Sequence, residues 1–579
     1  MPIHTFKHIT PGNGSAHSTA KCLLAVAVSS WMISCAGQVS PTGGPPDRVP
    51  PSVISTTPDT NAVRVSTKEI TLEFSKYVDR RTVEESIFIS PYLGKMEFKW
   101  SGREVAIQFK DTLRAHTTYV VNIGTDVVDL RERNRMGSGF TLAFSTGDSI
   151  DRGFIRGRVY DPRPEGVMIF AYLLNGVNPD TLDPARAKPD FIMQTGRGGT
   201  FTLSNLALGG YRLFAVRDEY RNLVYDKEID AIGVPAGDVL LEGPMPVVDG
   251  VYFRLTKEDT TRPFVVSATA PTRWQVEIRF NESLDSSRFA QSRFAVNDTV
   301  TGTAIPVLEA FLKRTQSPTA GLILGAPLDS PATYRVRAAN LFDRSGNPLS
   351  ESNNSAAFDG VLRPDTLRTK LTVVGLHDST RSVRPDAPVE FEFSEPVLHT
   401  SLERGILLTD SLRHRVRWRA SWKGPDRLLL TPEERLWPNA WYRLSVVMDS
   451  VKDLRQKRYR DSLFVLSFQT LDMKRTGEIE GQLVDSRTKG KPYRVSVENV
   501  DASPVPGRTI IMKGPGRFVI PQLVEGKYRI EAYEDADESG NYSFGAPHPF
   551  AAAERFAVYQ DTVKVRARWG VQGVVMQFK

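Results

Sequence analysis

Cysteine is almost absent from this chain. The 579 residues include two cysteines, Cys22 and Cys35, and both lie near the N-terminus. No disulfide can therefore form among the residues that follow Cys35. Each domain of that long segment must be stabilised by its own apolar core.

Histidine is also scarce, and the motifs of common active sites are missing. There is no G-x-S-x-G, no P-loop and no G-x-G-x-x-G after a strand. The histidines beyond the N-terminal region lack the i, i+2 or i, i+4 spacing of metal ligands; they are His116, His377, His399, His414 and His548. The pattern predicts a protein that is not an enzyme, although a carboxylate pair that meets across a sandwich stays open.

No apolar run is long enough to cross a bilayer as an ordinary helix. The most prominent run covers residues 22–33; Lys7 and Lys21 precede it, and no acidic residue occurs before Asp47. A basic start followed by a short apolar run is typical of a secretory signal peptide.

The end of this run, residues 32–35 (MISC), resembles the lipobox of bacterial lipoproteins. The resemblance implies that residues 1–34 are removed as a signal peptide and that Cys35 carries lipid. Residues 35–48 would then form a flexible tether rich in glycine and proline. Lipid chains anchor firmly because each buried methylene contributes about 0.8 kcal/mol. A plain signal peptide or a buried cysteine is the alternative.

Glycine (43) and proline (38) are plentiful, beside 40% apolar and 24% charged residues. This composition favours many short strands and turns over long helices. The net charge of +7 comes from interleaved charges, and the densest basic segment is 413–419. Its arginines alternate as on one solvated strand face, with no aromatic platform for base stacking, so we expect no nucleic-acid partner.

A first repeat occurs three times. Each copy opens with an alternating strand that ends in Phe and a small polar residue, at 70–75, 276–281 and 389–394. Leu/Tyr pairs and then aspartates follow: Leu113/Tyr119, Leu328/Tyr334 and Leu436/Tyr442, with Asp129, Asp343 and Asp453. The pattern resembles the S-layer-type bacterial Ig-like domain. Such sandwiches bury a corner tyrosine whose hydroxyl bonds to the backbone, so we expect a structural role for each tyrosine.

A second repeat occurs twice. Its copies begin at Gly153 and Gly477 with glycines and apolar residues at identical spacing, and the pairs Phe201/Tyr211 and Phe518/Tyr528 follow. This pattern resembles the carboxypeptidase regulatory-like, transthyretin-like sandwich. In that family the domain is usually an accessory module, so the resemblance implies little chemistry.

The two repeats predict an all-β chain of tandem Ig-like and transthyretin-like β-sandwich domains. The expected order is Ig-like (49–148), transthyretin-like (149–257), divergent Ig-like (258–364), Ig-like (365–473) and transthyretin-like (474–579). The mixture resembles lipoproteins of the Bacteroidetes type.

One acidic loop suggests a cofactor. Residues 535–540 match the first half of an EF-hand loop, in which alternate oxygens converge on Ca²⁺. We predict weak Ca²⁺ binding by Asp535, Asp537, Ser539 and Asn541, the last through its backbone carbonyl. Ala546 stands where the closing glutamate belongs, and a simple Asp/Gly hairpin is the alternative.

Half of the eight tryptophans fall in one predicted Ig-like domain. An exposed aromatic cluster there would bind a glycan or a protein, whereas core packing explains each ring alone. The candidates are Trp418, Trp422, Trp437 and Trp441.

The leading hypothesis for function is a non-catalytic envelope lipoprotein, an elongated rod of sandwiches that acts as a scaffold or spacer. A glycan- or protein-binding, adhesin-like module is the alternative, and a hydrolase is the third. Ala36 follows Cys35, and an aspartate there would resemble an inner-membrane retention signal. We therefore expect an outer-membrane lipoprotein facing the periplasm, with the cell surface as the alternative location.

Overall fold

The computed structural model describes residues 46–313, 318–366, 369–456, 463–487, 490–501 and 505–579. Strands make up 48% and helices 5% of the structure, which confirms the all-β prediction. Within the described ranges, no helix is both long and apolar enough to span a membrane. Cys35 lies outside them.

The first sandwich consists of two antiparallel sheets around one core. Alternation along β2 directs Ile70, Leu72 and Phe74 inward, where all three are fully buried. A short helix, α2 (Arg80–Ser86), begins at Asp79, whose carboxylate accepts a hydrogen bond from Arg81 N. One sheet has the strand order β1 (Val53–Thr57), β2 (Glu69–Phe74), β5 (Glu104–Phe109), β4 (Met96–Ser101). The other has the order β3 (Ile87–Ser90), β6 (Thr118–Ile123), β7 (Phe140–Ser145).

The third sandwich repeats this plan with two four-stranded sheets. Val276, Ile278 and Phe280 take the core positions of the first strand motif. The orders are β16 (Val265–Thr272), β17 (Gln275–Phe280), β21 (Thr319–Leu324), β20 (Val307–Leu312), and β19 (Ala304–Ile305), β18 (Arg293–Asp298), β22 (Thr333–Ala339), β23 (Ser355–Asp359), with η2 at Phe289–Gln291.

The fourth sandwich again has two four-stranded sheets, and Phe391 and Phe393 are fully buried. Its helical turns are α3 (His399–Leu402), η3 (Glu403–Gly405) and η4 (Met448–Ser450). The orders are β24 (Leu371–Val373), β26 (Val389–Phe393), β29 (Arg427–Pro432), β28 (Trp418–Gly424), and β25 (Thr380–Val383), β31 (Leu463–Thr470), β30 (Trp441–Val447), β27 (Ile406–Asp410).

The second and fifth sandwiches share a different topology, with one parallel strand pair in the smaller sheet. Gly157 and Gly481 occupy the same place in this sheet, where a Cβ would collide with the rings of Phe201 and Phe518. The conserved spacing of the second repeat therefore reflects close packing of a ring on the strand.

The five-stranded sheet of the second sandwich has the order β10 (Phe191–Gln194), β9 (Met168–Leu173), β12 (Gly209–Arg217), β13 (Ala231–Gly233), and β14 (Val239–Leu241) also pairs with β12. Its three-stranded sheet has the order β11 (Thr200–Leu206), β8 (Gly153–Tyr160), β15 (Val247–Arg254), and η1 lies at Pro179–Thr181. The corresponding sheets of the fifth sandwich are β34 (Arg508–Met512), β33 (Tyr493–Asn499), β36 (Gly526–Glu534), β37 (Phe556–Val558), β38 (Val563–Val565), and β35 (Gly516–Val524), β32 (Thr476–Val484), β39 (Gly570–Gln577), preceded by η5 (Met473–Arg475).

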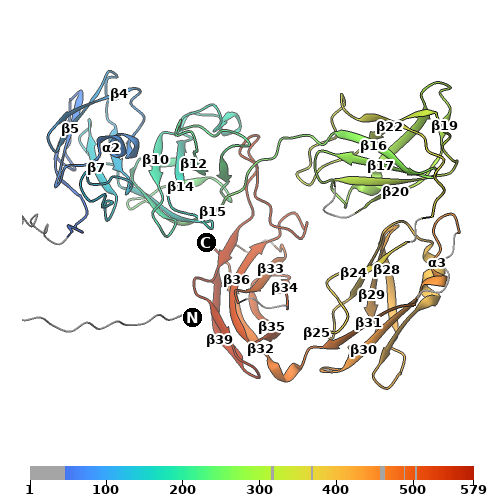
Figure 1. The fold of residues 1–579 in the computed structure, drawn as a ribbon. Coiled ribbons are helices and arrows are strands. Elements are labelled where there is room, and N and C mark those ends of the chain that lie inside the picture. The colour runs from blue at the N-terminus through green and yellow to red at the C-terminus, as the bar shows by residue number, and fades with distance from the viewer. Residues whose placement is uncertain (1–45, 314–317, 367–368, 457–462, 488–489, 502–504) are drawn as a thin grey trace, which may run out of the picture.

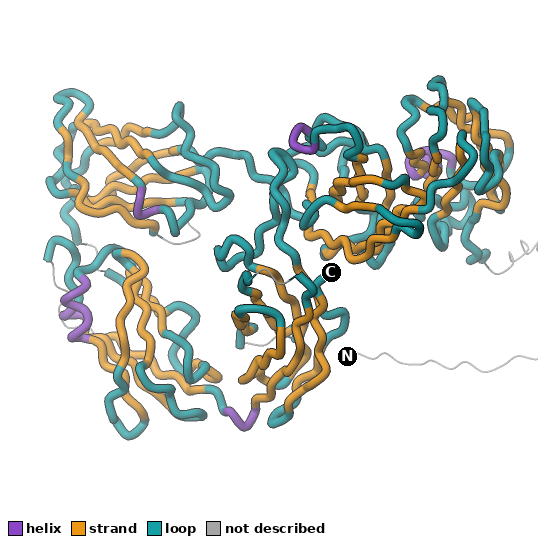
Figure 2. Tube along the Cα trace, turned by 180° about the vertical axis from the view of Figure 1, so that it is seen from behind, coloured by secondary structure: helices purple, strands orange, loops and turns teal. Residues whose placement is uncertain are grey.

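The five sandwiches do not form an extended rod. The chain turns back after the third sandwich, so that the fifth sandwich (red) lies beside the second (teal), and the view from behind agrees (Figures 1 and 2). The prediction of an elongated molecule is thus wrong. The molecule is not elongated because two sandwiches that are distant in the sequence are in contact. The repeat patterns describe single domains, so they do not predict a contact between domains.

The first part of this contact is made by residues 543–555, which we call the docking arm. Ala553 N on the arm donates a hydrogen bond to Pro235 O of the second sandwich (3.0 Å). The ring centroid of Phe550 lies 3.6 Å from the guanidinium carbon of Arg212, and the ring packs on the cluster that contains Phe214. The arm therefore contributes side chains to the core of another sandwich.

Arg254 at the end of β15 forms the second part of the contact. Its Nη2 lies 2.8 Å from Glu531 Oε2 in β36. The guanidinium carbon lies 4.7 Å from the Tyr542 ring centroid and 4.4 Å from that of Phe556. Ion pairing and cation–π attraction thus act on the same side chain.

Candidate functional site

The predicted calcium loop follows β36 and forms a hydrogen-bonded turn. The Asp537 carboxylate accepts a hydrogen bond from Ser539 N (2.9 Å), and Ser539 Oγ donates to the carbonyl oxygen of Asn541 (3.0 Å). The side chain of Asp535 is 1% exposed, and its carboxylate accepts from Gly540 N (3.2 Å). The four predicted ligand residues therefore belong to one compact turn.

Glu554 completes this turn, and sequence reasoning missed it. Its two carboxylate oxygens accept hydrogen bonds from Ala536 N (2.6 Å) and Ser543 N (3.0 Å). One oxygen from each of Asp535, Asp537 and Glu554 lies within 4.8 Å of the others. The EF-hand spacing points to Ala546, and no signal in the sequence points to Glu554, because only the return of the docking arm brings it there.

The charges of this turn are partly balanced. Arg494 Nε donates to Asp535 Oδ2 at 2.6 Å. Burial raises the pKa of Glu554, whereas the hydrogen bond from Ser539 lowers the pKa of Asp537. The oxygen set suits a hard cation such as Ca²⁺, which would compete with Arg494 for Asp535. Calcium binding here stays a prediction.

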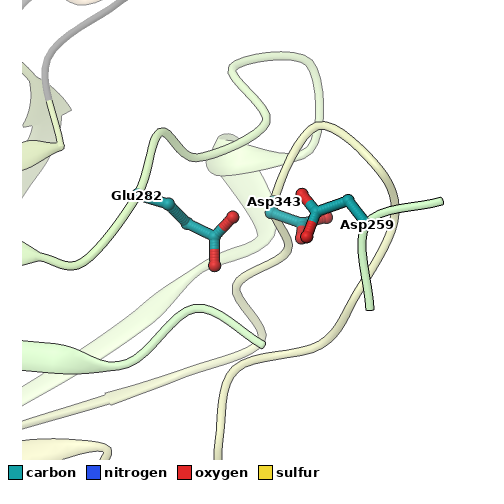
Figure 3. Close-up of side chains that lie close together, drawn as sticks. All are labelled: Asp259, Glu282 and Asp343. Atoms are coloured by element: carbon teal, nitrogen blue, oxygen red, sulfur yellow. The ribbon is translucent and has the colours of Figure 1, made fainter. Parts of the chain in front are cut away.

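A second acidic cluster lies in the third sandwich, at the end of β17. The carboxylates of Asp259, Glu282 and Asp343 come from three separate segments and turn toward one another (Figure 3). One oxygen of each lies within 4.8 Å of the others. Asp343 is buried, and its Oδ2 accepts a hydrogen bond from Asn347 Nδ2 (2.8 Å). Burial raises the pKa of Glu282, and the charges of Asp259 and Asp343 add to this effect.

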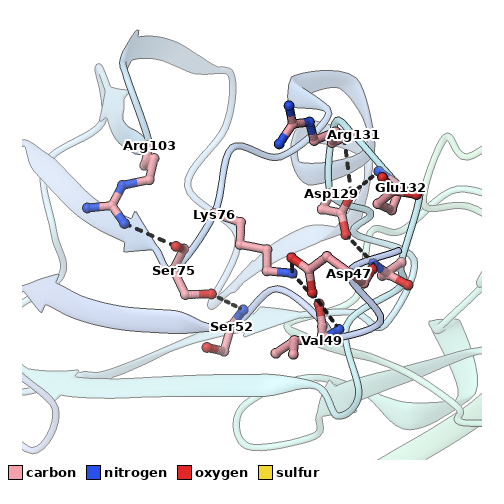
Figure 4. A network of polar contacts seen from close by, with 10 residues as sticks. Asp47, Val49, Ser52, Ser75, Lys76, Arg103, Asp129, Arg131 and Glu132 are labelled. Atoms are coloured by element: carbon pink, nitrogen blue, oxygen red, sulfur yellow. Dashed lines mark hydrogen bonds and ion pairs between the residues drawn. The ribbon is translucent and has the colours of Figure 1, made fainter. Parts of the chain in front are cut away.

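The corresponding corner of the first sandwich contains a lysine in place of the third carboxylate. Asp129 Oδ2 accepts from Asn134 Nδ2 (2.7 Å), as in the third sandwich, and Asn134 also donates to Asp47 O (2.6 Å). Lys76 stands two residues after the strand-end Phe74, and its Nζ lies 2.5 Å from both Asp47 Oδ2 and Val49 O (Figure 4). This contact lowers the pKa of Asp47. Glu282 thus replaces a cationic residue at the equivalent position.

Two of the predicted tryptophans face the core of the fourth sandwich. Trp418 and Trp422 lie on the edge strand β28 and are half-buried against the apolar cluster. Trp422 stacks on His399 with ring centroids 3.7 Å apart and on Phe393 at 6.4 Å. Its indole N–H is buried and has no hydrogen-bond partner in the described structure.

The other two tryptophans face solvent on the opposite sheet. Trp437, in the loop before β30, is 75% exposed, and Trp441, the first residue of β30, is 37% exposed. The four side chains are therefore divided between a core-facing pair and a solvent-facing pair. Glycan or protein binding by these rings stays a prediction.

The fold and the repeats define a multi-domain β-sandwich protein with Ig-like units. Residues 47–146 and 367–470 match the sequence model of the family described as Bacterial Ig-like domain. These segments contain the first and third copies of the first repeat. A search of curated protein sequences found no match.

Solved structures show distant likeness only. The N-terminal part of the bacterial S-layer protein SbsC has 13% identity and a TM-score of 0.16; the alignment covers 36% of this chain and 44% of that chain. An L,D-transpeptidase from Mycobacterium smegmatis has 12% identity and a TM-score of 0.16, with coverages of 37% and 90%. The major pilin subunit of Bacillus cereus has 9% identity and a TM-score of 0.13, with coverages of 74% and 100%. The alignment with the SbsC fragment spans less than half of that chain.

Proposed function

We propose that this protein is a non-catalytic lipoprotein of the cell envelope that acts as a closed multi-sandwich scaffold. Its lipid would be attached at Cys35 and would hold the chain on the membrane. The five sandwiches would then present surfaces to partners at fixed mutual positions.

The observation that carries the scaffold proposal is the contact between the second and fifth sandwiches. Two neighbouring pairs have direct polar contacts of their own: Ile192 N donates to Ser90 Oγ (3.1 Å) between the first and second sandwiches, and Gln275 Nε2 donates to Glu395 Oε2 (2.9 Å) between the third and fourth. The docking arm adds a link between units that are distant in sequence. Closing a chain of domains in this way limits their relative motion more than short linkers do.

The envelope part of the proposal rests on the sequence. Residues 1–35 have the features of a lipoprotein signal, and the chain beyond Cys35 contains no cysteine. Two bacterial Ig-like segments fit an extracytoplasmic protein. We favour the periplasmic face of the outer membrane over the cell surface, because no acidic cluster follows Cys35 before Asp47.

Cell fractionation tests the anchor. We expect the wild-type protein in the membrane fraction and Cys35→Ala in the soluble or uncleaved fraction, and Cys22→Ala is the matched control that should behave as wild type. An unchanged membrane fraction for Cys35→Ala would contradict the lipoprotein proposal. Digestion of intact cells with a non-penetrating protease then separates the two locations, since only surface display exposes the chain while a periplasmic marker survives.

A further inference from the structure

The junction of the fourth and fifth sandwiches carries two highly exposed tryptophans. Trp437 is 75% exposed and Trp569, in the turn before β39, is 71% exposed. The short helix η5, at the bottom of Figure 2, connects the two sandwiches. Both turns form hydrogen bonds to residues in η5 or next to it. Exposed apolar side chains that gather at one place mark an interaction site, whereas single apolar side chains scattered over a surface are common.

Hydrogen bonds tie both turns to this connector. Arg435 Nη2 lies 3.9 Å from Met473 Sδ, and Thr470 Oγ1 donates to Trp437 O (2.6 Å). On the other side, Arg568 N donates to Thr476 O (2.8 Å) and Arg568 Nε to Lys474 O (3.3 Å). The two tryptophans are therefore held on well-ordered turns.

The fold does not require a tryptophan at either position. Trp437 N donates to the corner hydroxyl of Tyr442 (2.8 Å), and the residues that make this contact in the other Ig-like sandwiches are Arg114 and Asp329. Trp569 O accepts a hydrogen bond from Glu478 N, and Pro246 O accepts the equivalent bond from Phe154 N in the second sandwich. The internal repeats thus have an arginine, an aspartate and a proline where the junction has indole rings.

Four exposed basic side chains lie at the same junction, among the carboxylates of Glu434, Asp472 and Glu478. Arg435, Lys474, Arg475 and Arg568 are all exposed, and in the described residues no carboxylate lies within ion-pair distance of them. The nearby Asp472 carboxylate instead caps Lys474 N (2.9 Å), and Glu434 pairs with Arg417. We call the two tryptophans and these four basic residues the junction patch.

We propose that the junction patch is a second membrane contact, at which the two indole rings enter the interface of an anionic lipid surface. Tryptophan favours the headgroup level of a bilayer because its ring is apolar and its N–H is polar. Basic side chains beside it gain from anionic headgroups. A soluble polyanion would need the charges alone, so the paired exposed rings favour lipid as the partner. This inference does not depend on lipidation of Cys35.

Vesicle binding by the chain from residue 46 onward tests the proposal without the anchor. This segment contains every apolar core found in the described residues. We expect it to co-sediment with phosphatidylglycerol/phosphatidylethanolamine vesicles, with tryptophan fluorescence quenched by brominated lipid, and to bind phosphatidylcholine vesicles at least about tenfold more weakly.

Two variants and one control locate the contact. Trp437→Ala/Trp569→Ala and Lys474→Glu/Arg475→Glu should each lower the affinity at least about tenfold with unchanged melting temperature, since all four side chains are exposed. Arg335→Glu/Arg337→Glu changes the net charge equally, on the exposed face of β22, and should bind as wild type. Failure of the wild-type segment to bind anionic vesicles, or equal loss in the control, would overturn the proposal. Displacement by millimolar glycerol phosphate, or binding to dextran sulfate that survives loss of both tryptophans, would overturn it too, because free anions would then explain the binding.

Discussion

A single substitution between repeats changes the charge balance of a whole corner. In the first sandwich Lys76 neutralises Asp47, whereas in the third Glu282 faces Asp259 and Asp343. The sequence shows the Lys-to-Glu difference, but it does not show that three carboxylates meet. These three carboxylates belong to segments that are far apart in the sequence, and only the folded sandwich brings them together.

Replacing Glu282 with Lys should stabilise the third sandwich, because it restores the ion pair of the first. We expect a gain of about 0.5–1 kcal/mol at pH 7 and low salt, measured by calorimetric unfolding. Lys76→Glu in the first sandwich is the reciprocal control and should destabilise. A loss of stability in Glu282→Lys would contradict the equivalence of the two corners.

The pH dependence of this corner follows from the raised pKa of Glu282. Its ordinary value is 4.5, and burial raises it in the folded state, so folding favours the protonated acid. The stability contribution of Glu282 is therefore full below pH 4.5 and is lost as the pH rises through the folded pKa. Glu282→Gln should be more stable than wild type at pH 7, and the difference should disappear near pH 4.

The acidic turn of the fifth sandwich should bind Ca²⁺ weakly. Three carboxylates meet there, but Arg494 already pairs with Asp535, so we expect a Kd of about 10⁻⁴–10⁻³ M. Titration calorimetry on the whole chain would show the heat, and Glu554→Gln should abolish it while Glu525→Gln, outside the turn, should not. Absence of both heat and a shift in melting temperature at millimolar calcium would end this idea.

At the scale of elements, the corner tyrosine is the most consistent feature of the Ig-like sandwiches. Tyr119, Tyr334 and Tyr442 are each at most 2% exposed, and their hydroxyls accept a backbone hydrogen bond at 2.8, 2.9 and 2.8 Å. The structural role expected from the sequence is therefore confirmed, because these hydroxyls bond to the chain itself.

Tyr442→Phe should destabilise the fourth sandwich by about 1–2 kcal/mol, since the N–H of Trp437 loses its acceptor. Four of the eight tryptophans lie in this sandwich, so the fluorescence change in urea reports on its unfolding more than on that of any other sandwich. Tyr220→Phe, at a side chain that is 63% exposed, is the control and should change nothing. Equal midpoints for Tyr442→Phe and wild type would show that the hydrogen bond contributes little.

At the scale of the whole molecule, closure depends on the contact between the second and fifth sandwiches. Phe550→Ala together with Arg254→Ala should open the molecule, because both the inserted ring and the ion pair with Glu531 are removed. Loss of the ring alone weakens docking by about 1–2 kcal/mol. Small-angle X-ray scattering should show a larger radius of gyration and maximum dimension, whereas Met245→Ala, at an exposed site of the second sandwich, should scatter as wild type. Unchanged scattering would show that closure does not require the side chains of Phe550 and Arg254.

The sequence by itself determined the all-β class and the two repeat types, because strand alternation, turn glycines and buried rings are local patterns that survive in any copy. Burial of Phe74, Phe280 and Phe393 follows directly from that alternation. The tertiary structure alone decided which residues meet: Glu554 at the acidic turn, Asp259 with Asp343, and the docking arm on the second sandwich. Such contacts join residues that are distant in the sequence, and no periodic pattern marks which of them will meet. They depend instead on how the sandwiches fold and pack in three dimensions.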